Sequence, residues 1–256
     1  MLDRRTVSTG LLAGAATSLL VGAGRAQAPV TARNVVLVHG AWADGSSWSE
    51  VIAHLQSAGF RATAVQNSLV SLADDVAATH RAIALQDGPT VLVAHSYAGT
   101  VVTQAGVDPK VSAVVYVAAR APDLGEDYTE LTTKFPAAPV GAGIVKSDGF
   151  IQLSEEAFLR DFANGVAPSK ARVLFAVQGP ISDKLFSART SSVAWKAKPS
   201  WYAVSRQDRA INPDLQRFFA KRMNATTIEL DAGHLSLVSH PKEIADLIKN
   251  SAGRRS

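Results

Sequence analysis

The stretch Thr90–Val102, which reads TVLVAHSYAGTVV, contains the features that decide the fold. It begins as an apolar, β-branched run typical of a buried strand and continues as small residues typical of a helix. Ser96 stands at the turn between them, with Ala94 and Ala98 where the usual G-x-S-x-G pattern has glycines. Small side chains at these places let strand and helix approach, and the sharp turn exposes the central hydroxyl. Ser96 is therefore predicted as a nucleophile; the alternative is an ordinary helix N-cap serine.

Short apolar runs alternate with amphipathic segments along the rest of the chain. The runs predict strands at 34–38, 61–65, 90–94, 113–118, 200–204 and 226–230. Apolar residues or small residues at helical spacing predict helices at 48–58, 72–85, 97–106, 213–223 and 241–250. This alternation is typical of an α/β fold, with a parallel sheet covered by helices on both faces. The rhythm breaks at about residues 122–198, which are predicted to form an inserted cap.

Composition excludes several classes of protein and site. The chain has 256 residues, 47% hydrophobic and 19% charged, which suits one globular domain. Cysteine is absent, so disulfides, thiolate nucleophiles and cysteine metal sites are excluded. The six histidines lack metal-ligand spacing, so no metal or cofactor is predicted. The net charge of +4 is spread along the chain, so no nucleic-acid surface is expected; oligomeric state stays open.

The N-terminal residues 1–28 have the pattern of an export signal. The pair Arg4 and Arg5 precedes a mild Gly/Ala/Thr-rich stretch, and the segment closes with Ala-Gln-Ala at 26–28. This pattern predicts a cleaved signal of the twin-arginine type. The alternative, a permanent membrane anchor, fits less well because the stretch is weakly apolar. The domain is therefore expected to span residues 29–256 and to work in the periplasm or outside the cell.

A serine hydroxyl needs an adjacent base to become a nucleophile at neutral pH. The only histidines after Ser96 are His234 and His240. His234 follows the predicted strand 226–230, in a loop that can reach the end of the serine strand. His240 precedes Pro241 at a predicted helix start, where a solvated side chain is expected. His234 is therefore predicted as the base.

In α/β folds whose nucleophilic serine stands at a strand-to-helix turn, the acid lies between the serine and the histidine along the chain. The acid that orients the base is therefore expected in that part of this chain. Asp208 lies four residues past the predicted strand 200–204, in a loop. Asp214 lies in the first turn of the next helix, where the helix dipole explains a carboxylate. Asp123, after an earlier strand, is the second candidate. Asp208 is the predicted acid.

Two backbone amides are predicted to form an oxyanion hole. The first predicted strand ends in the letters HGAW, a tight turn that can direct the amide of Ala41 into the site. The helix that starts at Tyr97 presents its own N–H groups above the serine. The amides of Ala41 and Tyr97 are therefore the expected donors. His39 is expected to hold the loop, and Trp42 and Trp48 either line the pocket or pack in the core.

Four segments, HGAWADGSSW, AHSYAG, QDRAINPDLQRF and AGHLSLVSHP, together resemble an α/β-hydrolase. The resemblance covers residues 34–250. It is strongest to the group that contains plant methyl-ester esterases, plant hydroxynitrile lyases and their bacterial relatives. It implies an eight-stranded, mostly parallel sheet with a helical cap. By position it also implies the same nucleophile, acid, base and oxyanion amides: Ser96, Asp208, His234, Ala41 and Tyr97.

The resemblance predicts a serine hydrolase without a cofactor, which cleaves a small to medium apolar or aromatic carboxylic ester through an acyl-enzyme. Trp42, Tyr128 and Phe135 are the candidate pocket residues, although the cap aromatics can equally form the cap's own core. Plant hydroxynitrile lyases of this group carry Thr at the position of Gly40 and Lys at that of Leu235, so hydrolysis is favoured over lyase chemistry. Acyl transfer, another cofactor-free reaction and small-molecule binding remain the alternatives.

Overall fold

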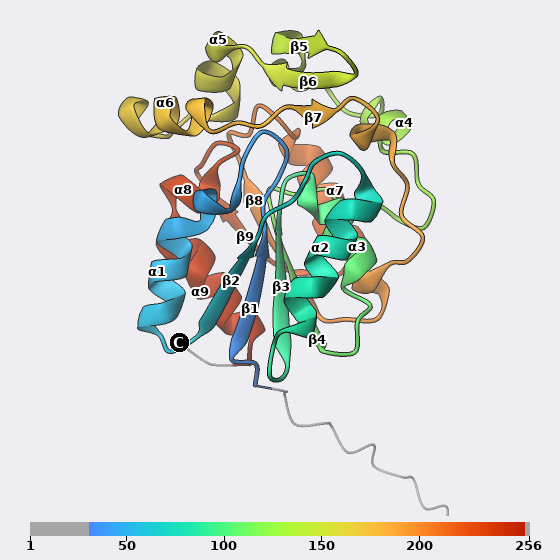
Figure 1. The fold of residues 1–256 in the computed structure, drawn as a ribbon, viewed down its shortest axis with the longest axis vertical. Helices are drawn as coiled ribbons and strands as arrows, with labels where there is room; N and C mark the ends of the chain where they lie inside the picture. Colours follow the sequence, from blue (N-terminus) through green and yellow to red (C-terminus); the bar gives the residue numbers. More distant parts are fainter. Residues whose placement is uncertain (1–30, 254–256) are drawn as a thin grey trace, which may run out of the picture.

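The structure is a computed structural model that describes residues 31–253. A central sheet lies between layers of helices, and a smaller cap covers one end of the sheet (Figure 1). The predicted export signal at residues 1–28 lies outside the described residues. Across 31–253, no helix combines the length and the apolar character that a membrane crossing requires.

The central sheet has six strands in the order β2-β1-β3-β4-β8-β9, and every neighbouring pair is parallel. They are β1 (Asn34–Val38), β2 (Arg61–Val65), β3 (Thr90–His95), β4 (Val111–Val117), β8 (Ser200–Ser205) and β9 (Thr226–Leu230). These are the six strands predicted from apolar runs. The expected eight strands were wrong for the described residues, because the extra two were implied by the resemblance alone and correspond to no apolar run in the sequence.

The strands in the middle of the sheet are buried along almost their whole length because helices cover both faces. β1 and β3 have no exposed residue, whereas the edge strands β2 and β9 are partly exposed. Since all six strands are parallel, their carboxyl ends meet at one edge, beneath the cap (Figure 1). Loops that leave this edge are therefore the natural place for a site.

Helices α1 (Ser49–Ser57) and α9 (Pro241–Ser251) pack together on one face of the sheet, and α2 (Leu72–Ala84) and α3 (Ala98–Ala105) pack together on the other (Figure 1). Helix α7 (Pro213–Arg222) packs against β8. All five were predicted, and their bounds agree to within one or two residues. The short helix α8 (Ser236–Ser239) was not predicted separately.

The chain between β4 and β8 forms the cap. Its helices and strands are α4 (Tyr128–Thr132), β5 (Ile144–Ser147), β6 (Phe150–Leu153), α5 (Glu155–Ala157), α6 (Pro168–Ala176) and β7 (Ile181–Ser182). The expected helical cap was thus only partly right, because β5, β6 and β7 form a three-stranded antiparallel sheet. A sequence signal for it exists: Asp148-Gly149 joins β5 to β6 with both residues at positive φ, as a type I′ hairpin turn requires.

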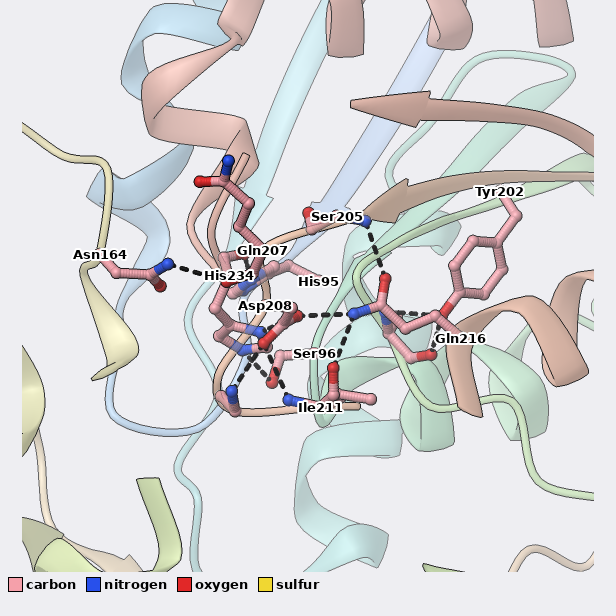
Figure 2. Close-up of polar contacts among 12 residues, drawn as sticks. His95, Ser96, Asn164, Tyr202, Ser205, Gln207, Asp208, Ile211, Gln216 and His234 are labelled. Atoms are coloured by element: carbon pink, nitrogen blue, oxygen red, sulfur yellow. Dashed lines mark hydrogen bonds and ion pairs between the residues drawn. The ribbon is translucent and has the colours of Figure 1, made fainter. Parts of the chain in front are cut away.

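Polar contacts tie the cap to the loop that follows β8. Asn164 of the cap donates from Nδ2 to the backbone oxygen of Gln207 at 2.8 Å (Figure 2). Arg209 donates from Nε to Asp161 of the cap at 2.7 Å, and the Asp161 side chain is fully buried. Arg160 contacts the same carboxylate, and its hydrogen bonds contribute most to lowering the pKa of Asp161. The cap and this loop are therefore held together by charge as well as by packing.

Candidate active site

Ser96 occupies the sharp turn between β3 and α3 that the sequence predicted. Its φ of 56° lies in the left-handed region, which a residue with a Cβ rarely adopts. A conformation of this kind costs roughly 1–3 kcal/mol and persists where the surroundings enforce it. The Ser96 N–H donates to the oxygen of Val117 at 3.2 Å, and the Ser96 oxygen accepts from the Arg120 N–H at 3.0 Å. The end of β4 thus fixes the strained turn.

Two glycines allow other segments to approach this turn closely. A Cβ at Gly99 would lie 1.7 Å from the backbone oxygen of Arg120, so the first turn of α3 can pack there only with glycine. A Cβ at Gly40 would lie 2.7 Å from the Cβ of Ser96. The loop after β1 therefore lies directly against the serine.

Replacing Gly99 with alanine is expected to lower the free energy of unfolding by at least about 2 kcal/mol, because the new methyl group collides with backbone that cannot rotate away. Urea unfolding followed by circular dichroism measures the change. Gly179→Ala is the matched control, since a Cβ there meets nothing within 4 Å. A Gly99→Ala protein as stable as the Gly179→Ala protein would contradict the close approach.

The structure brings the three predicted side chains together at the carboxyl edge of the sheet (Figure 2). His234 Nε2 lies 2.9 Å from Ser96 Oγ, and His234 Nδ1 lies 2.7 Å from Asp208 Oδ2. The carboxylate accepts from Nδ1–H, which leaves Nε2 free to accept the serine hydroxyl proton. All three residues are buried, so water competes little for these bonds. The arrangement can transfer a proton from Ser96 to His234.

The Asp208 carboxylate has four hydrogen-bond donors. Besides His234, the N–H groups of Ala210 and Ile211 donate to Oδ1 at 2.7 and 2.9 Å. The Nε2 of Gln216 donates to Oδ2 at 2.7 Å (Figure 2). These donors hold the carboxylate in one orientation, facing the histidine.

Gln216 was missed by the sequence reasoning, although it links three parts of the site. It lies on α7 with its side chain fully buried. Its Nε2 also donates to the oxygen of Ile211 at 2.9 Å, and its Oε1 accepts from the N–H of Ser205 at 3.0 Å. The available signal was a polar residue beside Leu215 and one turn before Phe219, on the face of the helix that packs into the core.

Two further histidines support the site. His95 is fully buried, and its Nε2 donates to the backbone oxygen of His234 at 3.0 Å. Burial lowers the pKa of His95 well below its usual value, so the ring is neutral at neutral pH. His39 donates from Nδ1 to the oxygen of Gly40 and accepts from the N–H of Asn67, both at 2.9 Å. His39 therefore holds the loop after β1, as expected.

The competing candidates lie elsewhere. Asp123 forms an ion pair with Lys196, and Asp214 pairs with Arg217 at 2.8 Å on the surface. His240 is half-buried and its Nδ1 lies 2.9 Å from a neighbouring serine hydroxyl. In the described part of the chain, none of these side chains contacts Ser96.

The two backbone amides predicted for the oxyanion hole make no other hydrogen bond among residues 31–253. Ala41 and Tyr97 are 2% and 1% exposed, and neither amide donates to any group between residues 31 and 253. A buried amide without a partner is rare in folded proteins. The Tyr97 hydroxyl donates to Asp75 on α2 at 3.1 Å, which anchors the residue that follows the nucleophile. Both amides are thus available to an oxyanion near Ser96.

A cavity of about 480 Å³ opens beside the serine and histidine, between the sheet edge and the cap. Ser96, His234 and the three predicted pocket residues Trp42, Tyr128 and Phe135 all line it. Its wall is largely apolar, which suits an organic ligand with few polar groups. Trp48, by contrast, is fully buried in the core.

Other cap aromatics form the cap's own core, which was the alternative to a pocket lining. Phe158 packs against Phe162 and Phe175, with ring centroids 5.0 and 5.6 Å apart. Phe162 also covers the ring of His234, at 5.0 Å between centroids. The cap therefore closes over the histidine. No cluster of three or more side chains suited to a metal ion occurs among residues 31–253.

A parallel sheet with a serine, a histidine and an aspartate joined at its carboxyl edge beneath a cap defines the α/β-hydrolase fold. The profile of the family described as "Alpha/beta hydrolase family" matches residues 35–247, and the chain belongs to this family. The resemblance noted from the sequence is thereby confirmed.

Named proteins of similar sequence and structure agree with this assignment. The chain is 25% identical over 242 residues to "Alpha/beta hydrolase nvfD" of Aspergillus novofumigatus, covering 86% of this chain and 96% of that protein. It superimposes on polyneuridine aldehyde esterase with a TM-score of 0.73 and 18% identity, covering 85% of this chain and 98% of the other. For the methylesterase MES16 from Arabidopsis the TM-score is 0.72 with 18% identity, covering 87% and 99%. The two structural likenesses show the shared fold.

Proposed function

We propose that the protein is a serine hydrolase that cleaves a small to medium carboxylic ester through an acyl-enzyme. The observation that carries the proposal is the chain of two hydrogen bonds, at 2.9 and 2.7 Å, that joins Ser96 through His234 to Asp208. The esterase names of the two solved neighbours support the same reaction class. The apolar, aromatic wall of the cavity favours an acyl or alcohol part that is itself apolar or aromatic.

In the proposed mechanism, Ser96 Oγ attacks the ester carbonyl while His234 Nε2 takes the hydroxyl proton. Asp208 keeps the imidazole in the required tautomer and stabilises its positive charge. The amides of Ala41 and Tyr97 donate to the oxyanion of the tetrahedral intermediate, and one such donor contributes roughly 2.7–4 kcal/mol. His234 then gives its proton to the leaving alcohol. A water molecule, deprotonated by His234, releases the acid and restores Ser96.

Ester hydrolysis is favoured over the lyase reaction by the packing around the serine. A Cβ at Gly40 would already lie 2.7 Å from the Cβ of Ser96, so the threonine of the plant lyases does not fit without a backbone shift. The lyase lysine is replaced by Leu235, which is 2% exposed and brings no charge to the histidine. Acyl transfer to an alcohol uses the same acyl-enzyme and differs only in the acceptor.

A fluorophosphonate probe and a small substrate panel test the proposal. The probe should label Ser96, located by mass spectrometry of the digested protein. p-Nitrophenyl acetate and butyrate should be hydrolysed, and a cyanohydrin such as mandelonitrile should not be cleaved. A protein that is neither labelled nor active on any ester, although folded by circular dichroism, would refute the assignment.

Replacing Gln216 with leucine is expected to lower kcat for p-nitrophenyl butyrate by roughly 10- to 100-fold and to change KM much less. The reason is that Asp208 loses one donor, while Ser205 and Ile211 lose their buried partner, at about 1–3 kcal/mol per unpaired group. Stopped assays give kcat and KM separately. Gln207→Leu is the control, because its exposed side chain bonds to Asp231 and to no other side chain among residues 31–253. Equal kcat values for both variants would exclude a positioning role for Gln216.

We also propose that the protein is exported, on the basis of Arg4, Arg5 and the Ala-Gln-Ala sequence at 26–28. Expressed in a bacterium with a twin-arginine pathway, the protein should be recovered from the periplasm or medium with Pro29 at its N-terminus. Lysine at positions 4 and 5 should leave the uncleaved chain in the cytoplasm. Export that is indifferent to both arginines would contradict the twin-arginine assignment.

A further inference from the structure

Arg120 is a buried cation in the wall of the candidate active-site cavity. It follows β4 by three positions, and its N–H donates to the oxygen of Ser96 at 3.0 Å, so its backbone is fixed against the nucleophile turn. The residue is 7% exposed. It lines the same cavity as Ser96 and His234. No step of the proposed mechanism uses it.

Arg120 is surrounded by aromatic rings and has no anionic partner among residues 31–253. Its guanidinium carbon lies 3.8 Å from the ring centre of Tyr128 and 4.3 Å from that of Phe186. Its Nε has no hydrogen-bond partner in the part of the chain that the structure describes. No carboxylate in residues 31–253 forms an ion pair with it. Burial lowers the pKa of the Arg120 guanidinium, and the hydroxyls of Tyr128 and Tyr97 offset only part of that shift. A buried guanidinium normally has an anionic partner.

Arg222 shows what a complete arginine site looks like in the same protein. Its guanidinium also lies over aromatic rings, 5.3 Å from the centres of Trp195 and Phe219. Both of its terminal nitrogens, however, donate to the carboxylate of Glu126, at 2.7 and 2.9 Å. Arg222 does not line the cavity. Arg120 has no such carboxylate partner among residues 31–253, and it lines the cavity in which a substrate would bind.

We propose that Arg120 binds an ionised carboxylate of the substrate, so that the site prefers esters that carry a second, free carboxylate. This inference rests on the proposed esterase function and narrows its substrate class. The guanidinium offers several N–H donors in one plane, which matches the geometry of a carboxylate. The rings of Tyr128 and Phe186 cover its faces, so the carboxylate meets the N–H edge while the apolar wall accommodates the connecting carbon chain.

Arg120 takes no part in bond making or breaking. A half-ester and water give the dicarboxylate, the alcohol and one proton, by the same steps at Ser96 and His234 as for a neutral ester. Arg120 is therefore a specificity residue, whose effect is the difference between charged and neutral esters. The ratio of activity on charged esters to activity on neutral esters is measured within each variant, so a general loss of activity does not change it.

The kinetic test compares monomethyl succinate, glutarate and adipate with the corresponding dimethyl esters in a pH-stat at neutral pH. 4-Acetoxybutanoate and methyl 4-acetoxybutanoate form the second arm, in which the carboxylate belongs to the alcohol part. The wild type should hydrolyse the best charged ester with a kcat/KM roughly 10- to 100-fold above its neutral partner, the range expected for a charge-assisted pair. Arg120→Met should abolish this ratio, and the matched control Arg222→Met should keep it.

Two results would overturn the proposal: a wild type that hydrolyses esters without preferring any charged one, or an Arg120→Met protein that retains the preference. Should Arg120→Met fail to fold, Arg120→Lys decides, because lysine keeps the charge and loses the planar fork. A reduced preference supports the proposal, and an unchanged preference overturns it.

A binding experiment separates this inference from the esterase proposal. In the Ser96→Ala protein, isothermal titration should show that the preferred charged ester binds roughly 10- to 100-fold more tightly than its neutral partner. This holds even if the wild type hydrolyses nothing, in which case the esterase proposal fails and the carboxylate site stands. Equal affinities, with hydrolysis of neutral esters intact in the wild type, would instead overturn the carboxylate site and leave the esterase proposal standing.

Discussion

The Ser96→Ala protein is expected to hydrolyse p-nitrophenyl butyrate at least roughly 10⁴-fold more slowly than the wild type, with a melting temperature almost unchanged. The Ser96 hydroxyl lies 2.9 Å from His234 Nε2 and is the nucleophile of the proposed mechanism, so its loss removes the acyl-enzyme route. Stability should hold because alanine occupies the same strained φ of 56° and loses a single hydrogen bond. Initial rates and differential scanning calorimetry on the same sample measure both quantities.

Ser236→Ala is the matched control for this variant. Ser236 is likewise buried, and its hydroxyl has no hydrogen-bond partner among residues 31–253. Its removal should leave kcat within a few-fold of the wild type. Turnover by Ser96→Ala comparable to that of Ser236→Ala would remove Ser96 from the mechanism, and with it the proposed acyl-enzyme.

The second large effect is expected for Asp208→Asn, at roughly 10³- to 10⁴-fold in kcat. An asparagine amide presents a donor among the N–H groups of Ala210 and Ile211 and the amide of Gln216, which need acceptors. Whichever way it turns, one donor faces another, and His234 loses the negative charge that stabilises its protonated form. The protein should stay folded because the side chains have nearly the same shape.

Two controls address the other carboxylates considered from the sequence. Asp214→Asn changes an exposed residue paired with Arg217, and Asp123→Asn changes the partner of Lys196. Both should retain wild-type kcat within a few-fold, since surface ion pairs contribute about 0–1 kcal/mol. If Asp123→Asn lost activity and Asp208→Asn did not, the acid would have been assigned to the wrong strand.

Most of the central domain was predictable because its signals are local. In Thr90–Val102, a run of four apolar residues, one serine and a run of small residues specify a strand, a turn and a helix without reference to the rest of the chain. The order serine, aspartate, histidine could also be found, since parallel strands send all their carboxyl ends to one edge. The sequence therefore predicted which side chains converge on Ser96.

The remainder depends mainly on contacts between distant segments, for which local patterns give at most a partial signal. The strands of the cap sheet are only two to four residues long, too short for a clear alternation. Gln216 stands on the core-facing side of its helix, but nothing in the sequence shows that its partner there is the Asp208 carboxylate. Arg120 follows a strand like an ordinary surface arginine, and only the structure reveals its burial beside the cavity.

The ties between Asn164 and Gln207, and between Asp161 and Arg209, place cap anchors on both sides of Asp208 along the chain. Movement of these cap segments to admit a bulkier ligand therefore pulls on the backbone that aims the carboxylate. The range of substrates that the cap admits and the turnover rate therefore depend on the same contacts between the cap and the loop of Asp208. Directed evolution that remodels these segments for new ligands should first pass through slow catalysts, with recovery through compensating changes at residues 206–212.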